Sequence, residues 1–507
     1  MYETPLALDI PPGIARSGTK MQSLGRWYDG HLVRFFDGAI LPVGGWARVQ
    51  DSSAADLAAL TGVPRAVLGW SSDEGVPLYA FGTNEKLYVL AAGAMADITP
   101  ADFTTGDVDS TFESGNYGDG LYGVGPYGAG SSLATQVEAA TWQLDSFADS
   151  SGNLLVGVCT SENKLRVWLG VPATAAVEPT ATGGTLPSDV RGVVMTPERF
   201  LVLLGGNTHA RRVQWADQES YTDWTTDDAT KQGGFIDLAT NGKLLCGRRG
   251  RGQTLLWTDL DLWSMTYIGG VFVYSFRQEG DQCGIIGPNA VALIDGKAVW
   301  MGRNAFFGFD GFVQAIPCEV GDYVFSDMNR AQAAKFFAVP IADFGEVWWF
   351  YCSHDSQEID RYVAFSTREN HWTIGKLSRT AATGAMGALG PVMCDAAGLV
   401  WQHEQDNERG SEVPYLESGP VLLGNGQRVM KVQRILPDEA SVGDVQAIVT
   451  PMMQPNDESA AQPAVTLTAQ TDVRYTARMI RLKLQEHLQK SWRVGRFQLG
   501  VIPGGTR

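Results

Sequence analysis

The chain has 507 residues, 44% of them hydrophobic, with 59 glycines, 15 tryptophans and a formal net charge of −17. A chain of this length can bury a large core, and this composition is typical of a folded, turn-rich protein. The acidic balance excludes tight sequence-independent binding to nucleic acid, because phosphate contacts need a basic surface. No apolar run approaches the ~20 residues of a membrane span, and no signal segment is recognisable. We therefore expect a protein made in a cytoplasm, with no membrane span.

Residues 1–61 are rich in turn formers and aromatic side chains and show no long hydrophobic period. Short strands are expected within them, for example at residues 31–36, because β-branched and aromatic residues gather there between turn signals. We interpret this unit as an extended N-terminal arm that packs on another part of the protein.

Short apolar runs separated by turn residues extend over residues 62–405. The clearest pair occupies residues 253–267, where two apolar runs containing Trp257 and Trp263 flank a polar turn at 259–261 and predict a β-hairpin. One hairpin cannot bury its own apolar face, so a stable fold needs several such hairpins packed together. Similar pairs occur at residues 78–90, 154–168, 193–204, 213–224, 305–313 and 363–374.

The spacing of these units favours one architecture. The aromatic residues at positions 215, 257, 307 and 365 lie 42, 50 and 58 residues apart in succession. Propeller blades recur at roughly 40 to 50 residues. The sequence therefore predicts an all-β fold whose main domain is a β-propeller of six or seven blades.

Two insertions interrupt the repeat. At residues 114–131, Tyr117, Tyr122 and Tyr127 each precede a glycine, and this composition suits a loop that packs on a neighbouring surface. A flexible linker with incidental tyrosines is the alternative. At residues 326–337, Ser326 is placed to cap a helix whose interior lacks glycine and proline, so we expect a helical insertion there.

The pattern changes to longer alternation in residues 406–507. Apolar and polar residues alternate over 480–485, and the alternation shifts by one residue at Gly495, which indicates a bulge. We expect a C-terminal β-sandwich-like domain, packed against the N-terminal arm.

Signals of catalysis or metal binding are weak. The six cysteines stand singly and the six histidines form no metal-binding motif, so reduced, buried thiols and no metal or cofactor are expected. The 56 acidic residues are abundant, but abundance does not place two carboxylates across a glycosidic bond. We predict no catalytic residues and a protein that is not an enzyme.

Arg248, Arg249 and Arg251 form a local basic patch in an acidic chain, next to the hairpin at 253–267. Two interpretations stay open: the patch contacts an acidic neighbouring subunit or DNA, or it lies in a solvated loop.

Several segments, in chain order, resemble tail proteins of short-tailed bacteriophages. The resemblance extends from the N-terminus to the last strand, and it identifies the tail nozzle family, also called tail hub or phage stabilisation proteins. Besides the tyrosine-glycine repeat, the matching segments are residues 11–19, 25–34, 42–46, 283–292, 299–302, 322–330, 345–351, 360–363 and 492–495.

The resemblance implies a structural virion protein, made in the host bacterial cytoplasm, that forms a homo-oligomeric ring, typically a hexamer, below the portal and the head-tail adaptor proteins. Such a ring extends the DNA channel, retains the packaged genome and conducts double-stranded DNA at ejection. It also contacts tail fibres or spikes and a needle or plug protein. We expect its lumen to be acidic or neutral, because such a wall lets DNA slide. The alternatives are a virion-associated glycan-degrading propeller and a receptor-binding propeller.

Overall fold

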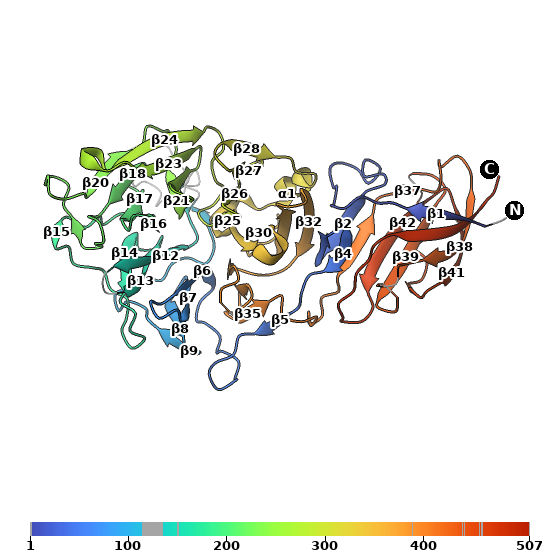
Figure 1. Cartoon of the computed structure of the whole chain (residues 1–507), viewed down its shortest axis with the longest axis horizontal. Helices are drawn as coiled ribbons and strands as arrows, with labels where there is room; N and C mark the ends of the chain where they lie inside the picture. The colour runs from blue at the N-terminus through green and yellow to red at the C-terminus, as the bar shows by residue number, and fades with distance from the viewer. Residues whose placement is uncertain are drawn as a thin grey trace, which may run out of the picture.

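The computed structural model describes residues 3–505 except 114–134, 150–151, 388, 439, 441, 456 and 458–459. Two bodies follow one another along the longest axis: a β-propeller, and a smaller β-sandwich near which both termini lie (Figure 1). The predicted all-β class is confirmed. The loop containing Tyr117, Tyr122 and Tyr127 lies outside the described residues.

Seven antiparallel sheets form the blades in the described part of the chain, within the predicted range of six or seven. From the axis outward, the first three blades are β6 (Pro64–Ser71), β7 (Pro77–Thr83), β8 (Leu87–Ala91) and β9 (Ala94–Asp97); β12 (Trp142–Asp149), β13 (Gly152–Cys159) and β14 (Lys164–Trp168); and β16 (Gly192–Met195), β17 (Leu201–Leu204), β18 (Arg212–Trp215) and β20 (Gly234–Asp237). The fourth and fifth blades are β21 (Leu244–Arg249), β22 (Thr254–Thr258), β23 (Leu262–Tyr267) and β24 (Tyr274–Gly280); and β25 (Val291–Ile294), β26 (Lys297–Met301), β27 (Phe306–Phe309) and β28 (Val313–Ile316). The sixth and seventh blades are β29 (Phe337–Ile341), β30 (Glu346–Tyr351), β31 (Arg361–Ser366) and β32 (His371–Lys376); and β33 (Ala381–Thr383), β34 (Val392–Cys394), β35 (Val400–His403) and β5 (Trp46–Arg48).

The last blade takes its outermost strand from the N-terminal arm. Strand β5 pairs antiparallel with β35, so residues more than 350 positions apart share one sheet. Neighbouring inner strands pack around a common axis, and β33 packs against β6 to complete the circle. The circle of blades is therefore closed by the pairing of β5, from the N-terminal arm, with β35 of the last blade.

The hairpin predicted at residues 253–267 is present as β22 and β23, joined antiparallel. The Thr258 hydroxyl accepts hydrogen bonds from the backbone N–H groups of Leu260 and Asp261, at 3.0 and 2.8 Å, and so stabilises the turn. Trp257 is fully buried, and its ring meets that of Trp300 in the next blade edge to face, with centroids 5.7 Å apart. The hairpin tryptophan therefore joins two blades.

The predicted hairpin at residues 213–224 is wrong in its second strand. Strand β18 pairs with β20, whereas β19 (Asp223–Trp224) pairs in parallel with β15 (Gly183–Gly184). The Asp217 carboxylate accepts the backbone N–H of Gln232 at 2.9 Å, and the indole of Trp215 donates to the carbonyl of Gln232 at 2.8 Å. These contacts bring a later segment back to β18.

The helix predicted at residues 326–337 is present only in part. An α-helix, α1 (Gly321–Asp327), ends where it was expected to begin, and a 3-10 segment, η2 (Arg330–Lys335), precedes β29. Between them Met328 is extended and bridges Ser353, and the backbone N–H of Asn329 donates to the carbonyl of Cys352 at 2.9 Å. Pairing with a neighbouring segment thus interrupts a sequence of high helix propensity.

The second body contains two sheets drawn from both ends of the chain. One has the order β1 (Thr4–Leu8), β43 (Phe497–Pro503), β38 (Met430–Leu436) and β41 (Thr471–Ala477). The other has the order β2 (Trp27–His31), β36 (Tyr415–Ser418), β42 (Met479–Glu486), β39 (Val445–Met452) and β40 (Val465–Thr466), with β37 (Val421–Leu422) also on β42. In β42 buried and partly exposed residues alternate, as in a strand with one covered face.

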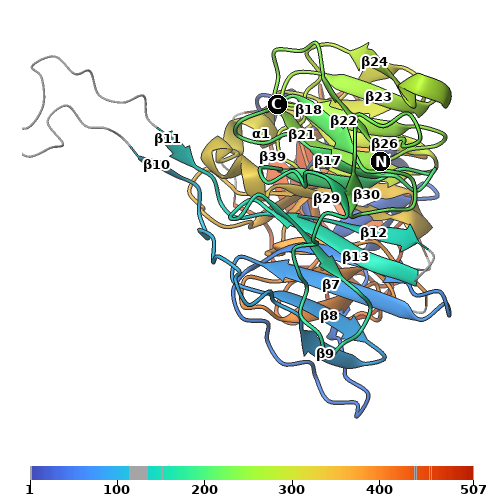
Figure 2. The same ribbon diagram turned by 90° about the vertical axis from the view of Figure 1, so that its left-hand side faces the viewer.

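In the described ranges, two further strand pairs lie outside these sheets. The hairpin of β3 (Val33–Phe36) and β4 (Ala39–Pro42) belongs to the N-terminal segment, next to the start of β5. Strands β10 (Thr111–Glu113) and β11 (Thr135–Val137) pair as a two-stranded ribbon that projects from the blades (Figure 2). Among the described residues no helix is long and apolar enough to cross a membrane.

Candidate functional site

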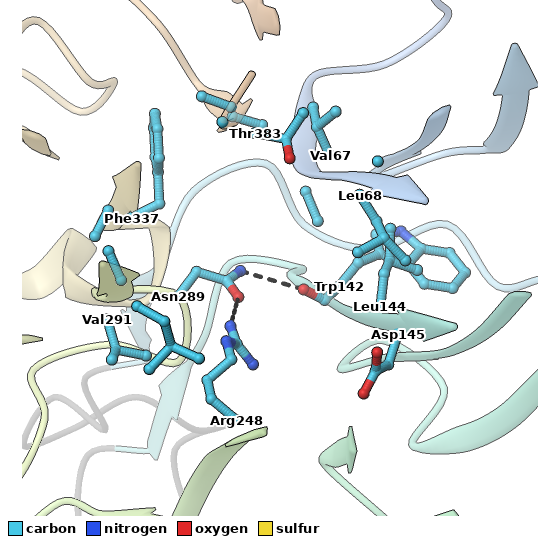
Figure 3. Close-up of a pocket in the computed structure, with 18 of the residues that line it drawn as sticks. Val67, Leu68, Trp142, Leu144, Asp145, Arg248, Asn289, Val291, Phe337 and Thr383 are labelled. Atoms are coloured by element: carbon cyan, nitrogen blue, oxygen red, sulfur yellow. Dashed lines mark hydrogen bonds between the residues drawn. The ribbon is translucent and has the colours of Figure 1, made fainter. Parts of the chain in front are cut away.

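The inner strands of all seven blades surround a cavity of about 560 Å³ on the propeller axis (Figure 3). Much of its wall is apolar, with Val67, Leu68 and Leu144 on one side and Val291 and Phe337 on another. The strands that line a propeller axis are short apolar segments, so such a wall follows from the repeat itself. We call this space the axial cavity.

Charged side chains also reach the axial cavity. Three arginines line it, Arg65, Arg248 and Arg249, and among the described lining residues Asp145 is the only carboxylate. The cavity is thus locally cationic within a chain of net charge −17.

Arg65 is neutralised at the end of the axis where the inner strands begin. Its guanidinium donates to both carboxylate oxygens of Glu358, at 2.8 and 2.7 Å, and to the carbonyl of Val108 at 2.9 Å. Gln332 of η2 lies in the same region and exchanges hydrogen bonds with the backbone of Ser110, at 2.9 and 2.8 Å. Buried polar contacts therefore crowd this end of the axis.

Arg248 has uncharged partners. Its guanidinium donates to the side-chain oxygens of Gln143 and Asn289, at 3.1 and 3.0 Å, and to the carbonyls of Gly247 and Pro288, at 2.9 and 3.4 Å. The side-chain nitrogen of Asn289 in turn donates to the carbonyl of Trp142 at 3.2 Å, and this contact orients the side-chain oxygen of Asn289 toward Arg248 (Figure 3). In the described part of the chain no carboxylate lies within ion-pair distance of Arg248.

Arg249 and Asp145 form a loose pair on the wall. The guanidinium nitrogen Nη2 of Arg249 lies 3.4 Å from Oδ1 of Asp145, and its Nε donates to the carbonyl of Met195. The Asp145 carboxylate accepts the backbone N–H groups of Ser146 and Met195, both at 2.8 Å. Burial raises the pKa of Asp145, and Arg249 and these N–H groups oppose that rise.

The structure separates the predicted basic patch. Arg248 and Arg249 line the axial cavity, whereas Arg251 is exposed in the turn after β21. Sequence reasoning missed Arg65, Asp145 and Asn289. Arg65 and Asp145 lie outside every strand pair that the sequence predicted, so no signal pointed to them. Asn289 precedes its strand and likewise carries no signal.

A second feature is the turn between β23 and β24, which we call the apolar tip and define as residues 268–273. It contains the 3-10 segment η1 (Gly270–Phe272). Val271 is 96% exposed, Phe272 78% and Ile268 57%. Val273 has a φ of 55°, which is strained for a β-branched residue. A strained turn thus presents three apolar side chains to solvent.

In the described residues no group of three or more histidine, cysteine or acidic side chains is arranged to hold a metal ion. The six cysteines are free, and all except the half-buried Cys318 are buried. Burial raises the pKa of the Cys246 thiol to about 11.

No family model matches the sequence, and no curated protein matches it. Among the solved structures that are similar to it are two of low sequence identity. The CNH domain of AfRom2 is 9% identical, with 68% of this chain and 97% of that chain covered and a TM-score of 0.34. A candidate gluconolactonase is 10% identical, with 79% and 99% covered and a TM-score of 0.31. At these scores neither comparison assigns a function.

Proposed function

We propose that this chain is a structural subunit of a phage tail, a nozzle or hub protein that assembles into a hexameric ring below the head-tail adaptor. The ring extends the DNA channel, retains the packaged genome and conducts it during ejection. The ordered sequence resemblance along the chain supplies the family. The apolar tip is the observation on the molecule that supports assembly.

The argument from the apolar tip is energetic. Fully burying a side chain such as Val271 or Phe272 is worth roughly 1.5 to 3 kcal/mol relative to leaving it in water. A strained residue such as Val273 costs on the order of 1 to 3 kcal/mol. The strain of Val273 is offset within the monomer, because its own side chain is buried in the core. An isolated monomer gains nothing from the exposed side chains, whereas a subunit that buries them against a neighbour recovers that free energy. A closed ring requires this kind of head-to-tail contact.

The way the two bodies are joined supports a role in which the subunit resists mechanical force. The N-terminal segment supplies β1 and β2 to the sandwich and β5 to the last blade, and β36 to β43 follow the propeller in the chain. Separating the bodies therefore requires strands to unpair as well as the chain to extend. A subunit that holds packaged DNA under pressure benefits from that continuity.

The ring and its contacts can be tested with the purified full-length chain. Native mass spectrometry and negative-stain microscopy, alone and with head-tail adaptor proteins, should show a closed ring. A chain that stays monomeric with adaptor would contradict the proposal. Release of reducing sugar from host glycans, or binding of the isolated chain to intact host cells, would instead favour the glycan-degrading or receptor-binding alternative.

A further inference from the structure

We propose that the axial cavity binds a small organic anion, whose carboxylate or phosphate group lies against Arg248 and Arg249 and whose apolar part packs on the cavity wall. This inference rests on the cavity alone and is independent of the proposed role in a phage tail.

The charge distribution points to an anion. Arg65 already has Glu358 as its partner, which leaves Arg248 and Arg249 facing the single carboxylate of Asp145. Arg248 is half-buried and Arg249 is 38% exposed, so both cations stay partly hydrated where they face the cavity. The dipoles of four neutral oxygens hold Arg248 in place but do not balance its charge. An anion in the cavity would do so.

The guanidinium of Arg248 is held in a defined position. The side-chain nitrogen of Gln143 donates to the carbonyl of Pro288 at 3.1 Å and to Oδ1 of Asn289 at 3.2 Å, which orients both amide groups around the arginine. Among the described residues the four neutral oxygens occupy the hydrogens on Nη1 and Nη2 of Arg248, so an anion would accept from its Nε–H and from Nη1 of Arg249. Because the site is assembled before the ligand arrives, little conformational entropy is lost on binding.

Size and wall chemistry narrow the ligand class. The cavity of about 560 Å³ is within the range of small-molecule sites, roughly 300 to 1,000 Å³. Leu68, Leu144 and Phe337 offer apolar surface to the part of the ligand that is not charged. Asp145 disfavours a high negative charge, so a monocarboxylate is expected to bind more tightly than a phosphate dianion.

The test is calorimetric titration of the full-length chain at low salt with phenylacetate, phenyl phosphate and the neutral 2-phenylethanol. We expect saturable one-to-one binding of phenylacetate, weaker binding of phenyl phosphate and none of the alcohol. Arg248→Gln should weaken binding by about tenfold or more, since a charge-assisted contact is lost. Arg251→Gln, in an exposed turn outside the cavity, is the matched control and should bind as the unaltered chain does.

A second variant separates loss of the site from loss of the fold. Arg249→Gln removes the second cation that faces the anion, at a side chain that is 38% exposed and outside the core. It should weaken binding by about threefold or more while circular dichroism and the melting temperature stay near those of the unaltered chain. The proposal is overturned if neither anion binds up to millimolar concentration, if 2-phenylethanol binds as tightly as phenylacetate, or if Arg249→Gln binds normally.

Discussion

The guanidinium of Arg34 donates to both carboxylate oxygens of Glu404, at 2.6 and 3.0 Å, and lies 3.2 Å from the carboxylate of Glu346. Its side chain is only 1% exposed. Arg34 belongs to β3 in the N-terminal segment, Glu346 to the propeller strand β30, and Glu404 follows β35. The buried charges therefore fasten the arm to two blades of the propeller.

Removal of Arg34 should be strongly destabilising. Arg34→Met leaves the buried carboxylate of Glu346 and the half-buried one of Glu404 without their cation, so we expect a loss of about 3 to 5 kcal/mol in the free energy of unfolding. Denaturant unfolding measures it. The matched control is Arg199→Met, because the pair of Arg199 with Glu219 is exposed and such pairs contribute about 1 kcal/mol or less. Equal effects of the two variants would show that the buried pair is not structurally important.

Truncation of Trp257 should open a cavity between two blades. Trp257 is fully buried and packs against Trp300, so Trp257→Ala should cost roughly 3 to 5 kcal/mol. Leu260→Ala, at the exposed turn of the same hairpin, should change stability by about 0.5 kcal/mol or less. A normal melting temperature in the tryptophan variant would contradict the packing described for this hairpin.

Stability should fall in mild acid because of His403. Burial, with Arg379 beside it, holds the pKa of His403 well below 6.5, and its Nε2 accepts a hydrogen bond from Arg379 at 3.0 Å. The unfolded chain therefore takes up a proton below about pH 6.5 that the folded chain does not. Each pH unit below 6.5 should cost about 1.4 kcal/mol until the folded pKa is reached.

The contribution of His403 can be isolated by substitution. In His403→Gln the side-chain oxygen still accepts from Arg379, but the titrating group is gone, so unfolding measured between pH 7 and 5 should lose part of its slope. His354→Gln, at an exposed position, should keep the slope of the unaltered chain. An unchanged slope in His403→Gln would mean that other groups set the acid sensitivity.

The apolar tip should matter for assembly and not for the fold. Val271→Ser with Phe272→Ser removes exposed side chains, so the unfolding free energy should change by about 0.5 kcal/mol or less per site. Ring formation with adaptor, followed by native mass spectrometry, should weaken at least tenfold. Phe235→Ser, a half-exposed position on β20, is the control. Full ring formation by the double variant would exclude the tip as a subunit contact.

The sequence by itself determined the local units. Hairpins such as β22–β23, β27–β28 and β31–β32 follow from runs of four to six mostly apolar residues bounded by polar turns. Their pairing partners are adjacent in the chain, so turn chemistry and hydrophobic pattern are sufficient. The spacing of these units along the chain then predicted a propeller.

Only the tertiary structure decided the features that join distant segments. The helix propensity of residues 326–337 was overridden by backbone pairing to residues 352 and 353, and β18 found its partner beyond a long loop. The basic patch separated because Arg248 and Arg249 occupy an inner strand and Arg251 a turn. The circle of blades is closed by β5, which lies more than 350 residues from its partner strand β35. For the helix, for β18 and for the closure of the propeller, the deciding contact is with a segment that is not adjacent in the chain, and no local pattern encodes it.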